Sequence, residues 1–297
     1  MSYPTTATVP STARATSAVA SVRRAVSRVV IWALLIATAL LVLFPVVIAL
    51  LGSFKTNAEL TAGATLLPSD WQLENYAHAW KEANFARYTW NSTFVSVATT
   101  VMTLLVASMA AVAVDRLHFP GKKIFVAIQA ATMFVSVGAV VLRPQFELMV
   151  DLKLHTSLWG VILILISAHA AAFFMLLSFM KAIPRDLDEA AMIDGASFAR
   201  TYRSVLLPLL LPGLGVAGLF AFRGAWNEFI LPQVFTLNSP ELQTLTVGLA
   251  ALRYGSSAAT QTHLMMAGAS LSMLPLLLLY ALANRTFMQV TAGSVKG

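Results

Sequence analysis

Residues 29–51, VVIWALLIATALLVLFPVVIALL, form an apolar stretch without a single charged side chain. A transmembrane α-helix needs about 20 consecutive, mostly apolar residues, so this stretch is long enough to cross a bilayer. The strands of a membrane β-barrel instead alternate apolar and polar residues over segments of about 10, and no such alternation occurs here. Residues 29–51 therefore predict a membrane-spanning helix and an all-α membrane protein.

The composition of the whole chain agrees with a membrane protein. Of its 297 residues, 58% are hydrophobic and only 11% are charged, and the mean hydropathy is +0.75. Soluble chains carry about 25% charged residues, so a soluble globular enzyme is excluded. The absence of cysteine excludes disulfides, thiolate metal sites and cysteine nucleophiles.

Five further apolar segments follow the first one. We predict one transmembrane domain, residues 29–297, with six spans at residues 29–51, 93–114, 124–142, 158–180, 205–231 and 264–283. Residues 1–28 show no apolar periodicity, and we predict a disordered cytoplasmic tail there. The first apolar run exceeds the roughly 7–15 residues of a signal-peptide core, which favours a retained anchor.

The lysine and arginine residues predict how the spans are oriented. With the N-terminus inside, the inner segments carry thirteen of these residues and the outer segments six, and Arg223 lies within a span. The positive-inside rule then predicts a multi-pass inner-membrane protein with both termini in the cytoplasm. Although the net charge is +7, the basic residues form no continuous stripe, so we expect no nucleic-acid partner.

The first predicted outer segment, residues 54–91, is rich in aromatic side chains. Amphipathic rings of this kind gather at the level of the lipid headgroups. The segment therefore favours either an interfacial belt or a docking surface for an external partner. The aromatic residues are Trp71, Tyr76, Trp80, Tyr88 and Trp90.

The predicted inner segment at residues 181–204 is amphipathic, and its acids gather within residues 186–194. Asp186 and Glu189 fit a variant of the capping box at the start of a helix, and Gly195 supplies the backbone freedom to end it after about two turns. Ser197 is placed to cap a second helix that runs into the fifth span, with Pro208 where it meets the membrane. A two-turn helix is marginal alone in water, so we expect it to dock on a partner.

The composition of this short helix indicates the kind of partner. Ala190 and Ala191 give it a small, flat face, and four acids surround that face within residues 186–194. A basic, concave protein surface would complement them. The alternative is a helix lying on anionic lipid, although the acids would be repelled by such a leaflet.

These residues resemble the EAA loop of the membrane subunits of binding-protein-dependent ABC importers. The resemblance rests on Glu189-Ala190-Ala191, then Gly195 after three residues, then Val205-x-Leu207-Pro208 after nine more. Further motifs resemble carbohydrate permeases similar to the maltose permease, and the resemblance extends from about Val29 to the last residue. These motifs are Ser53–Thr56, Asn75-Tyr76, Asn91-Ser92, Phe119–Lys122, Trp226–Phe229 and Val290–Gly297.

The resemblance implies the permease fold and a half-channel that works by alternating access. It also implies the partners: a second permease subunit, two ATP-binding subunits that carry the ATP and Mg²⁺, and an extracytoplasmic sugar-binding protein. The chain itself would bind no cofactor and would contact lipid. The implied ATPase-coupling residues are Asp188, Glu189, Ala190, Ala191, Asp194 and Gly195.

The chain carries no motif of an enzyme. The Gly121-Lys122 pair has Arg116 where a phosphate-binding loop needs glycine and Lys123 where it needs serine or threonine. The five histidines lack metal-ligand spacing, and no G-x-S-x-G elbow occurs. We therefore predict a transport subunit without catalytic or metal-binding residues.

The fifth predicted span carries the candidates for the substrate pathway, because ionisable residues at membrane depth are costly and mark pathways or buried pairs. Arg223, Trp226, Asn227 and Glu228 offer hydrogen-bonding groups and an aromatic plane for a sugar. Alternatively, Arg223 and Glu228 join the two permeases or reach toward the outer surface.

The sequence thus predicts the permease subunit of an ATP-driven importer of mono-, di- or oligosaccharides. A first alternative keeps this architecture but changes the cargo to an amino acid, a polyamine or a glycerophosphate. A second is an ATP-independent secondary transporter, for which the spans carry few of the charges that a proton relay needs.

Overall fold

A computed structural model describes residues 12–63, 65–82, 84–134, 138–254 and 261–294, and this part of the chain contains helices and no strand. The prediction of an all-α protein is therefore confirmed. The helices are α1 (Thr12–Gly52), α2 (Asn57–Ala62), α3 (Glu74–Glu82), α4 (Phe85–Arg116), α5 (Lys122–Phe134), η1 (Gly138–Val141), α6 (Leu142–Asp151), α7 (Leu158–Ser167), α8 (Ala170–Lys181), α9 (Asp186–Ile193), α10 (Phe198–Thr201), η2 (Tyr202–Leu206), α11 (Leu207–Leu209), α12 (Leu211–Trp226), α13 (Ile230–Phe235), η3 (Pro240–Leu242), α14 (Leu245–Tyr254) and α15 (Thr262–Ser294).

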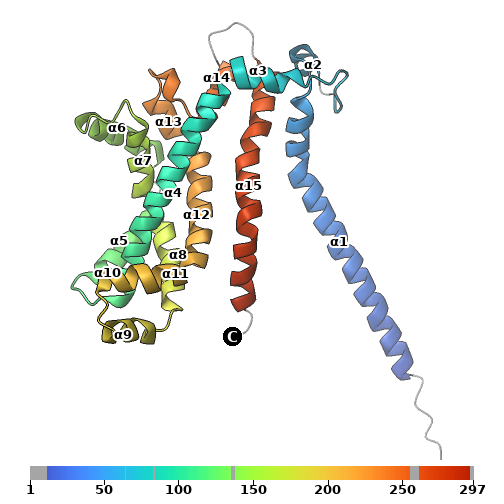
Figure 1. Cartoon of the computed structure of the whole chain (residues 1–297). Coiled ribbons are helices and arrows are strands. Elements are labelled where there is room, and N and C mark those ends of the chain that lie inside the picture. The colour runs from blue at the N-terminus through green and yellow to red at the C-terminus, as the bar shows by residue number, and fades with distance from the viewer. Residues whose placement is uncertain (1–11, 64, 83, 135–137, 255–260, 295–297) are drawn as a thin grey trace, which may run out of the picture.

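Helix α4 is the central element of the fold: α7, α8, α12 and α14 pack against it, and α15 packs on α12 (Figure 1). It contributes a buried side chain to each of the four hydrophobic clusters: Phe85, Val95, Ala107 and Val112 belong to different ones. Small residues allow the neighbouring helices to approach closely, as in other membrane bundles. Any movement of α4 would therefore displace side chains in all four clusters.

Three single helices of the described part are long and apolar enough to cross a membrane: Val26–Gly52, Phe85–Arg116 and Thr262–Ala281. They coincide with the first, second and sixth predicted spans. Two bent pairs of helices coincide with the fourth and fifth: α7 with α8, bent by 50°, and residues 198–209 with α12, bent by 76°. Up to five spans result if each bent pair crosses once.

The third predicted span, residues 124–142, differs from the structure. Helix α5 has 13 residues and ends at Phe134, whereas residues 135–137 lie outside the described part and η1 follows at Gly138. At 1.5 Å per residue, α5 is about 20 Å long, too short to cross a hydrocarbon core of about 30 Å alone. The count of six spans therefore stays a prediction.

Part of the predicted N-terminal tail is helical. Helix α1 begins at Thr12, so residues 12–28 form a helix rather than the disordered segment predicted there; residues 1–11 lie outside the described part. The physical reason is that no proline or glycine interrupts residues 12–44, while alanine, the strongest helix former, recurs through the first turns. The first span is thereby extended on its N-terminal side.

The two ends of the molecule differ in the elements that they carry. Helices α9 and α10 lie at the same end as the start of α1 and the end of α15, whereas α2, α3 and α14 lie at the opposite end (Figure 1). This arrangement fits the predicted topology, in which both termini and the segment 181–204 share one side. That this side is cytoplasmic stays a prediction.

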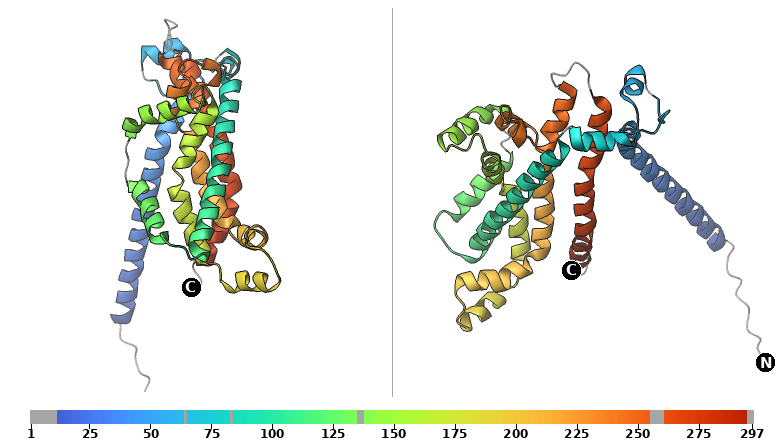
Figure 2. Two further views of the ribbon diagram at one scale, coloured as in Figure 1. Left: turned by 90° about the vertical axis from the view of Figure 1, so that its left-hand side faces the viewer. Right: turned by 45° about the horizontal axis from the view of Figure 1, so that its top comes forward.

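Helix α1 leaves most of its apolar surface uncovered. It lies beside α15 at one end and diverges from the bundle toward its start (Figure 2). None of the span window within residues 26–52 is buried, and Leu41 is 76% exposed. Because large apolar patches on a chain mark contacts with lipid or another protein, α1 requires one of these surroundings.

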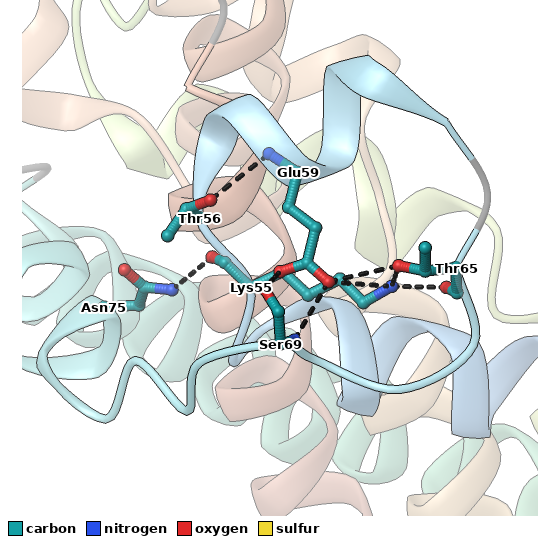
Figure 3. A network of polar contacts seen from close by, with 6 residues as sticks. All are labelled: Lys55, Thr56, Glu59, Thr65, Ser69 and Asn75. Carbon is teal, nitrogen blue, oxygen red and sulfur yellow. Dashed lines mark hydrogen bonds and ion pairs between the residues drawn. The ribbon is translucent and has the colours of Figure 1, made fainter.

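The predicted outer segment is ordered by a polar network around Lys55 (Figure 3). Buried Lys55 donates to the backbone and hydroxyl oxygens of Thr65 and lies 3.9 Å from the carboxylate of Glu59, which also accepts bonds from Ser69. Asn75 donates to the backbone oxygens of Ser53 and Lys55 at 2.9 Å each. The segment is therefore an ordered structure held by hydrogen bonds rather than an unstructured loop.

Candidate functional site

Helix α9 lies in the segment predicted to contact a partner, and the chain after its C-terminal end has the predicted local structure. It spans eight residues, Asp186–Ile193, and Gly195 adopts φ +77°, the left-handed conformation that favours glycine after a helix. Ser197 begins the next helix, α10, and accepts a hydrogen bond from the backbone N–H of Arg200 at 3.4 Å. Both predicted turn residues therefore have the expected local roles.

The N-terminal end of α9 differs from the predicted capping box. Arg185 is the N-cap residue and makes no side-chain cap, while Asp186 is already the first helical residue. The guanidinium of Arg185 is directed elsewhere, to the backbone oxygen of Asp115 on α4 at 3.0 Å. Acids in the first turn still stabilise α9 through its dipole, without closing a capping box.

Helix α9 presents two different faces. Asp188 is buried at 6% exposure, whereas Glu189, Ala190 and Asp194 are exposed. Apolar side chains accompany the exposed acids, and Ile193 is 86% exposed. The four acids predicted to surround one docking face are thus divided: one is turned into the chain and three are available to a partner.

The buried face of α9 is attached to the end of α4 by Arg116. Its guanidinium forms ion pairs with the carboxylates of Asp188 and the adjacent Asp115, and donates to the backbone oxygen of Ile183 at 2.9 Å. The Arg116 and Asp188 side chains are 7% and 9% exposed. Removing Arg116 would leave the Asp188 carboxylate as an uncompensated buried charge, a change that typically costs about 3–5 kcal/mol.

The chain leaves α9 through a sharp bend rather than a straight helix. Helix α10 continues into η2, a π-helical turn, and the following α12 is bent by 76° from this segment. The fifth predicted span, residues 205–231, therefore includes the bend, and its longest straight helix is α12, Leu211–Trp226. The hydroxyl groups of Tyr202 on η2 and Ser108 on α4 lie 2.8 Å apart and fasten the bend to α4.

A cavity of about 390 Å³ lies between α4, α7, α8 and α12. Apolar side chains make most of its wall, including the exposed ring of Phe220. Its polar groups are the hydroxyls of Thr99 and Thr103 and the carboxylate of Glu228. Thr99 is 4% exposed, and its hydroxyl has no hydrogen-bond partner in the described part of the chain.

The four predicted pathway residues occupy three different environments. Trp226 is 3% exposed, stacks on Phe222 and donates from Nε1 to the backbone oxygen of Ser272 at 3.2 Å, so its ring packs against α15. Arg223 is exposed, and Asn227, also exposed, donates to its backbone oxygen at 2.9 Å. Only Glu228, of these four, lines the cavity.

Glu228 is held in position by the start of α13, the helix that follows it. Its Oε1 accepts from the backbone N–H groups of Ile230 and Leu231 at 3.1 and 3.2 Å, which caps the start of α13. No described residue donates to its Oε2. One carboxylate oxygen thus has a role in the fold, and the other does not.

Sequence comparison identifies the family of the chain. Residues 11–289 match the family described as the binding-protein-dependent transport system inner membrane component. The chain belongs to this family. It is therefore a multi-pass membrane protein and a component of a transport system, in agreement with its apolar helices and with the resemblance found in the segment 181–204.

Relatives of this transport component carry names that refer to carbohydrates. It is 32% identical to a diacetylchitobiose uptake system permease protein of Streptomyces coelicolor, over 89% of this chain and 85% of that protein. It is 31% identical to an arabinooligosaccharides transport system permease protein of Halalkalibacterium halodurans, over 93% and 100%. It is 35% identical to a sulfoquinovosyl glycerol transport system permease protein of Agrobacterium fabrum, over 86% and 89%.

A solved structure shares the fold of this transport component. With a TM-score of 0.73, the chain resembles one in a bacterial ABC transporter involved in the import of the acidic polysaccharide alginate. The match covers 94% of this chain and 99% of that chain at 22% identity. The permease fold predicted from the sequence is therefore confirmed.

Three residues of the site were missed by the sequence analysis. The sequence indicates Arg116 only as an inner positive charge and as a departure from a phosphate-binding loop, and Thr99 and Thr103 only as part of an apolar span. Their spacing by four on one helix face, i to i+4, was a usable signal for the threonines. The pairing of Arg116 with Asp188 joins residues 72 positions apart and leaves no local signal.

Proposed function

We propose that this chain is the permease subunit of an ATP-driven carbohydrate importer and forms half of its translocation pathway. One observation carries the proposal: α9, an eight-residue helix, projects exposed acids and apolar side chains at one end of a chain that belongs to a family of transport components. A helix of this length is marginal alone, so its outer face requires a partner.

The exposed face of α9 supports an ATPase as that partner. Glu189 is free to accept charge-assisted hydrogen bonds from a basic residue, which are about twice as strong as neutral ones. Ala190 permits close approach, and Leu187, Met192 and Ile193 offer apolar area. ATP and Mg²⁺ would then be bound by the partner, because this chain has no phosphate-binding loop.

The complete importer would contain a second permease, two ATP-binding subunits and an extracytoplasmic sugar-binding protein. The family description supports the binding protein, and the uncovered surface of α1 supports a further membrane subunit. In this arrangement α9 faces the cytoplasm and the network around Lys55 faces the binding protein.

The cavity between α4, α8 and α12 is the best supported contact with the cargo. A sugar ring offers hydroxyls and an apolar C–H face, and the cavity offers the free Oε2 of Glu228 and the Phe220 ring, with the buried Thr99 hydroxyl beneath its wall. Among the described lining residues, Glu228 carries the only charge, which favours uncharged saccharides over glycerophosphates and other anions. Arg223 and Asn227 would act at the edge of the pathway.

Affinity purification of this chain from detergent extracts of its native membrane tests the proposed assembly. We expect an ATPase, a second permease and a solute-binding protein to copurify. Ile193→Asp, which changes an 86% exposed side chain, is expected to release the ATPase and retain the second permease. Leu66→Asp, at an exposed site of the outer segment, is the control and should retain both.

The same preparation separates the alternatives. If a binding protein loaded with an amino acid or polyamine stimulated its ATP hydrolysis, that solute and not a carbohydrate would be the cargo. Movement of solute across vesicles by this chain alone, driven by an ion gradient, would overturn the proposed function in favour of a secondary transporter.

A further inference from the structure

Arg116 belongs neither to the docking face of α9 nor to the lining of the cavity. It lies at the last residue of α4, where the backbone carbonyl groups lack helical partners and the helix dipole attracts cations. Arg185 also donates to a carbonyl group there, that of Asp115. Cations from both helices thus hold α9 against the end of α4.

The attachment is reciprocal: the contacts of Arg116 are buried and that of Arg185 is exposed. Arg116 extends from α4 to the Asp188 carboxylate and the Ile183 carbonyl group, while Arg185 extends from the start of α9 to α4. Asp115 lies beside Arg116, so two acids and two cations share the cluster. Because Arg116 and Asp188 are almost inaccessible to water, they interact more strongly than an exposed pair.

The cluster connects α9 to the wall of the cavity. Thr99 and Thr103 lie on α4, the helix that ends at Arg116, so the distance along the helix from Thr103 to Arg116 is about 20 Å at 1.5 Å per residue. The other path from α9 follows the chain through α10 and η2 to α12, which forms the opposite wall. Helix α9 thus reaches both walls by two paths, which the contact between Tyr202 and Ser108 also joins to each other.

We propose that Arg116 is the joint through which movement of α9 is transmitted to α4, and hence to one wall of the cavity. The proposal rests on the proposed function, in which an ATPase moves α9. With the joint intact, α4 and α12 move together when α9 is displaced. Without it, α12 still follows through the continuous chain, whereas α4 is linked to this movement only by the weaker contacts of Arg185 and Tyr202. Helix α4 then follows less closely, so ATP is hydrolysed without a matching movement of sugar.

The test uses the complete importer in proteoliposomes and measures sugar moved per ATP hydrolysed. Arg116→Gln and Asp188→Asn are expected to lower this ratio about tenfold, within the range of 5–150-fold that is typical of coupling between sites. The double exchange of Arg116→Asp with Asp188→Arg re-forms an ion pair and is expected to restore at least a third of the ratio. Lys181→Gln, a change of an exposed cation on the same side, should leave it unchanged.

If the pair had only a structural role, its variants would lower the yield of complex but leave the sugar moved per ATP by each assembled complex unchanged. That result would reject the proposed role of Arg116. If the single variants lower the ratio and the exchange does not restore it, the ion pair is likewise rejected as the joint. Arg116→Lys keeps the charge but lacks the second donor arm, so an intermediate ratio is expected even where the stronger variants assemble poorly.

The design separates this inference from the proposed function. Failure of the wild-type complex to couple ATP hydrolysis to sugar uptake would contradict the proposed function itself. If both the wild type and Arg116→Gln coupled ATP hydrolysis fully to sugar uptake, only the role of Arg116 would be contradicted.

Discussion

At the scale of single residues, the cavity contains a polar atom that folding leaves unsatisfied. The Thr99 hydroxyl is buried in an apolar wall and has no partner among the described residues. Leaving a buried hydroxyl without a hydrogen bond costs about 1–3 kcal/mol, so a ligand that displaces the covering side chains and supplies the bond recovers part of this free energy. Ser96, one turn earlier on α4, also lacks a partner but does not line the cavity.

Thr99→Val therefore has opposite expected effects on folding and on transport. The free energy of unfolding should stay unchanged or rise, because no bond within the described chain is lost. The sugar concentration for half-maximal uptake should rise about 2–10-fold, which corresponds to one net hydrogen bond of 0.5–1.5 kcal/mol. Ser96→Ala is the matched control, and an equal rise in that variant would show that the cavity does not bind the sugar through Thr99.

At the scale of the elements, helix packing depends on residues that lack a side chain. A Cβ atom at Gly213 of α12 would lie 2.7 Å from the ring of Phe179 on α8, whereas a Cβ atom at Gly224 would meet nothing within 4 Å. The contact at Gly213 is with the base of the Phe179 side chain, which has little freedom to move away. The two positions on one helix therefore form a natural pair for comparison.

Gly213→Ala should lower the thermal stability of the purified chain, and Gly224→Ala should not. Overpacking of this kind typically costs about 1–3 kcal/mol. Replacing glycine by alanine in a helix without a clash instead gains up to about 1 kcal/mol. Thermal unfolding in detergent measures both variants, and an equal loss of stability in the two would contradict the close packing of α12 on α8.

The network of the outer segment is expected to depend on pH. Desolvation raises the pKa of Glu59, but hydrogen bonds from Ser69 and Thr65 and the charge of Lys55 outweigh it and lower the pKa below the ordinary value of 4.5. A carboxylate with a lowered pKa contributes stability above its unfolded pKa, and this contribution is lost as the pH falls through the folded value.

Hydrogen exchange of residues 56–75 measures this effect. The exchange should accelerate as the pH is lowered below 4.5, after correction for the intrinsic rate, and Glu59→Gln should exchange rapidly without this dependence. Identical pH profiles for the wild type and Glu59→Gln would exclude the carboxylate as the group that orders the segment.

At the scale of the whole molecule, features encoded locally were predictable and features created by distant contacts were not. Gly195 and Ser197 punctuate the chain by their own backbone and side-chain preferences, and the apolar run at residues 29–51 is long enough to define its helix. The ring of Trp226 was assigned to the pathway because a helical periodicity gives its direction but not its neighbour, and α15 covers it. Asp188 was assigned to the partner for the same reason, although Arg116 already pairs with it.

Three surfaces of the described chain lack a covering neighbour within it. The uncovered surface of α1, the half-exposed cavity wall at Phe220 and the exposed acids of α9 each require a different neighbour. Coupling then depends on α4, which is attached to α9 at Arg116 and lines the cavity with Thr99 and Thr103. The central claim is that a separate ATPase drives this chain through α9.

Uptake of labelled saccharide into proteoliposomes tests this claim most directly, with the complete complex in the membrane, the binding protein outside and ATP inside. The account predicts uptake that requires ATP and falls at least about tenfold in Glu189→Lys while the chain remains inserted. Uptake without the ATPase, or undiminished uptake by Glu189→Lys, would contradict it.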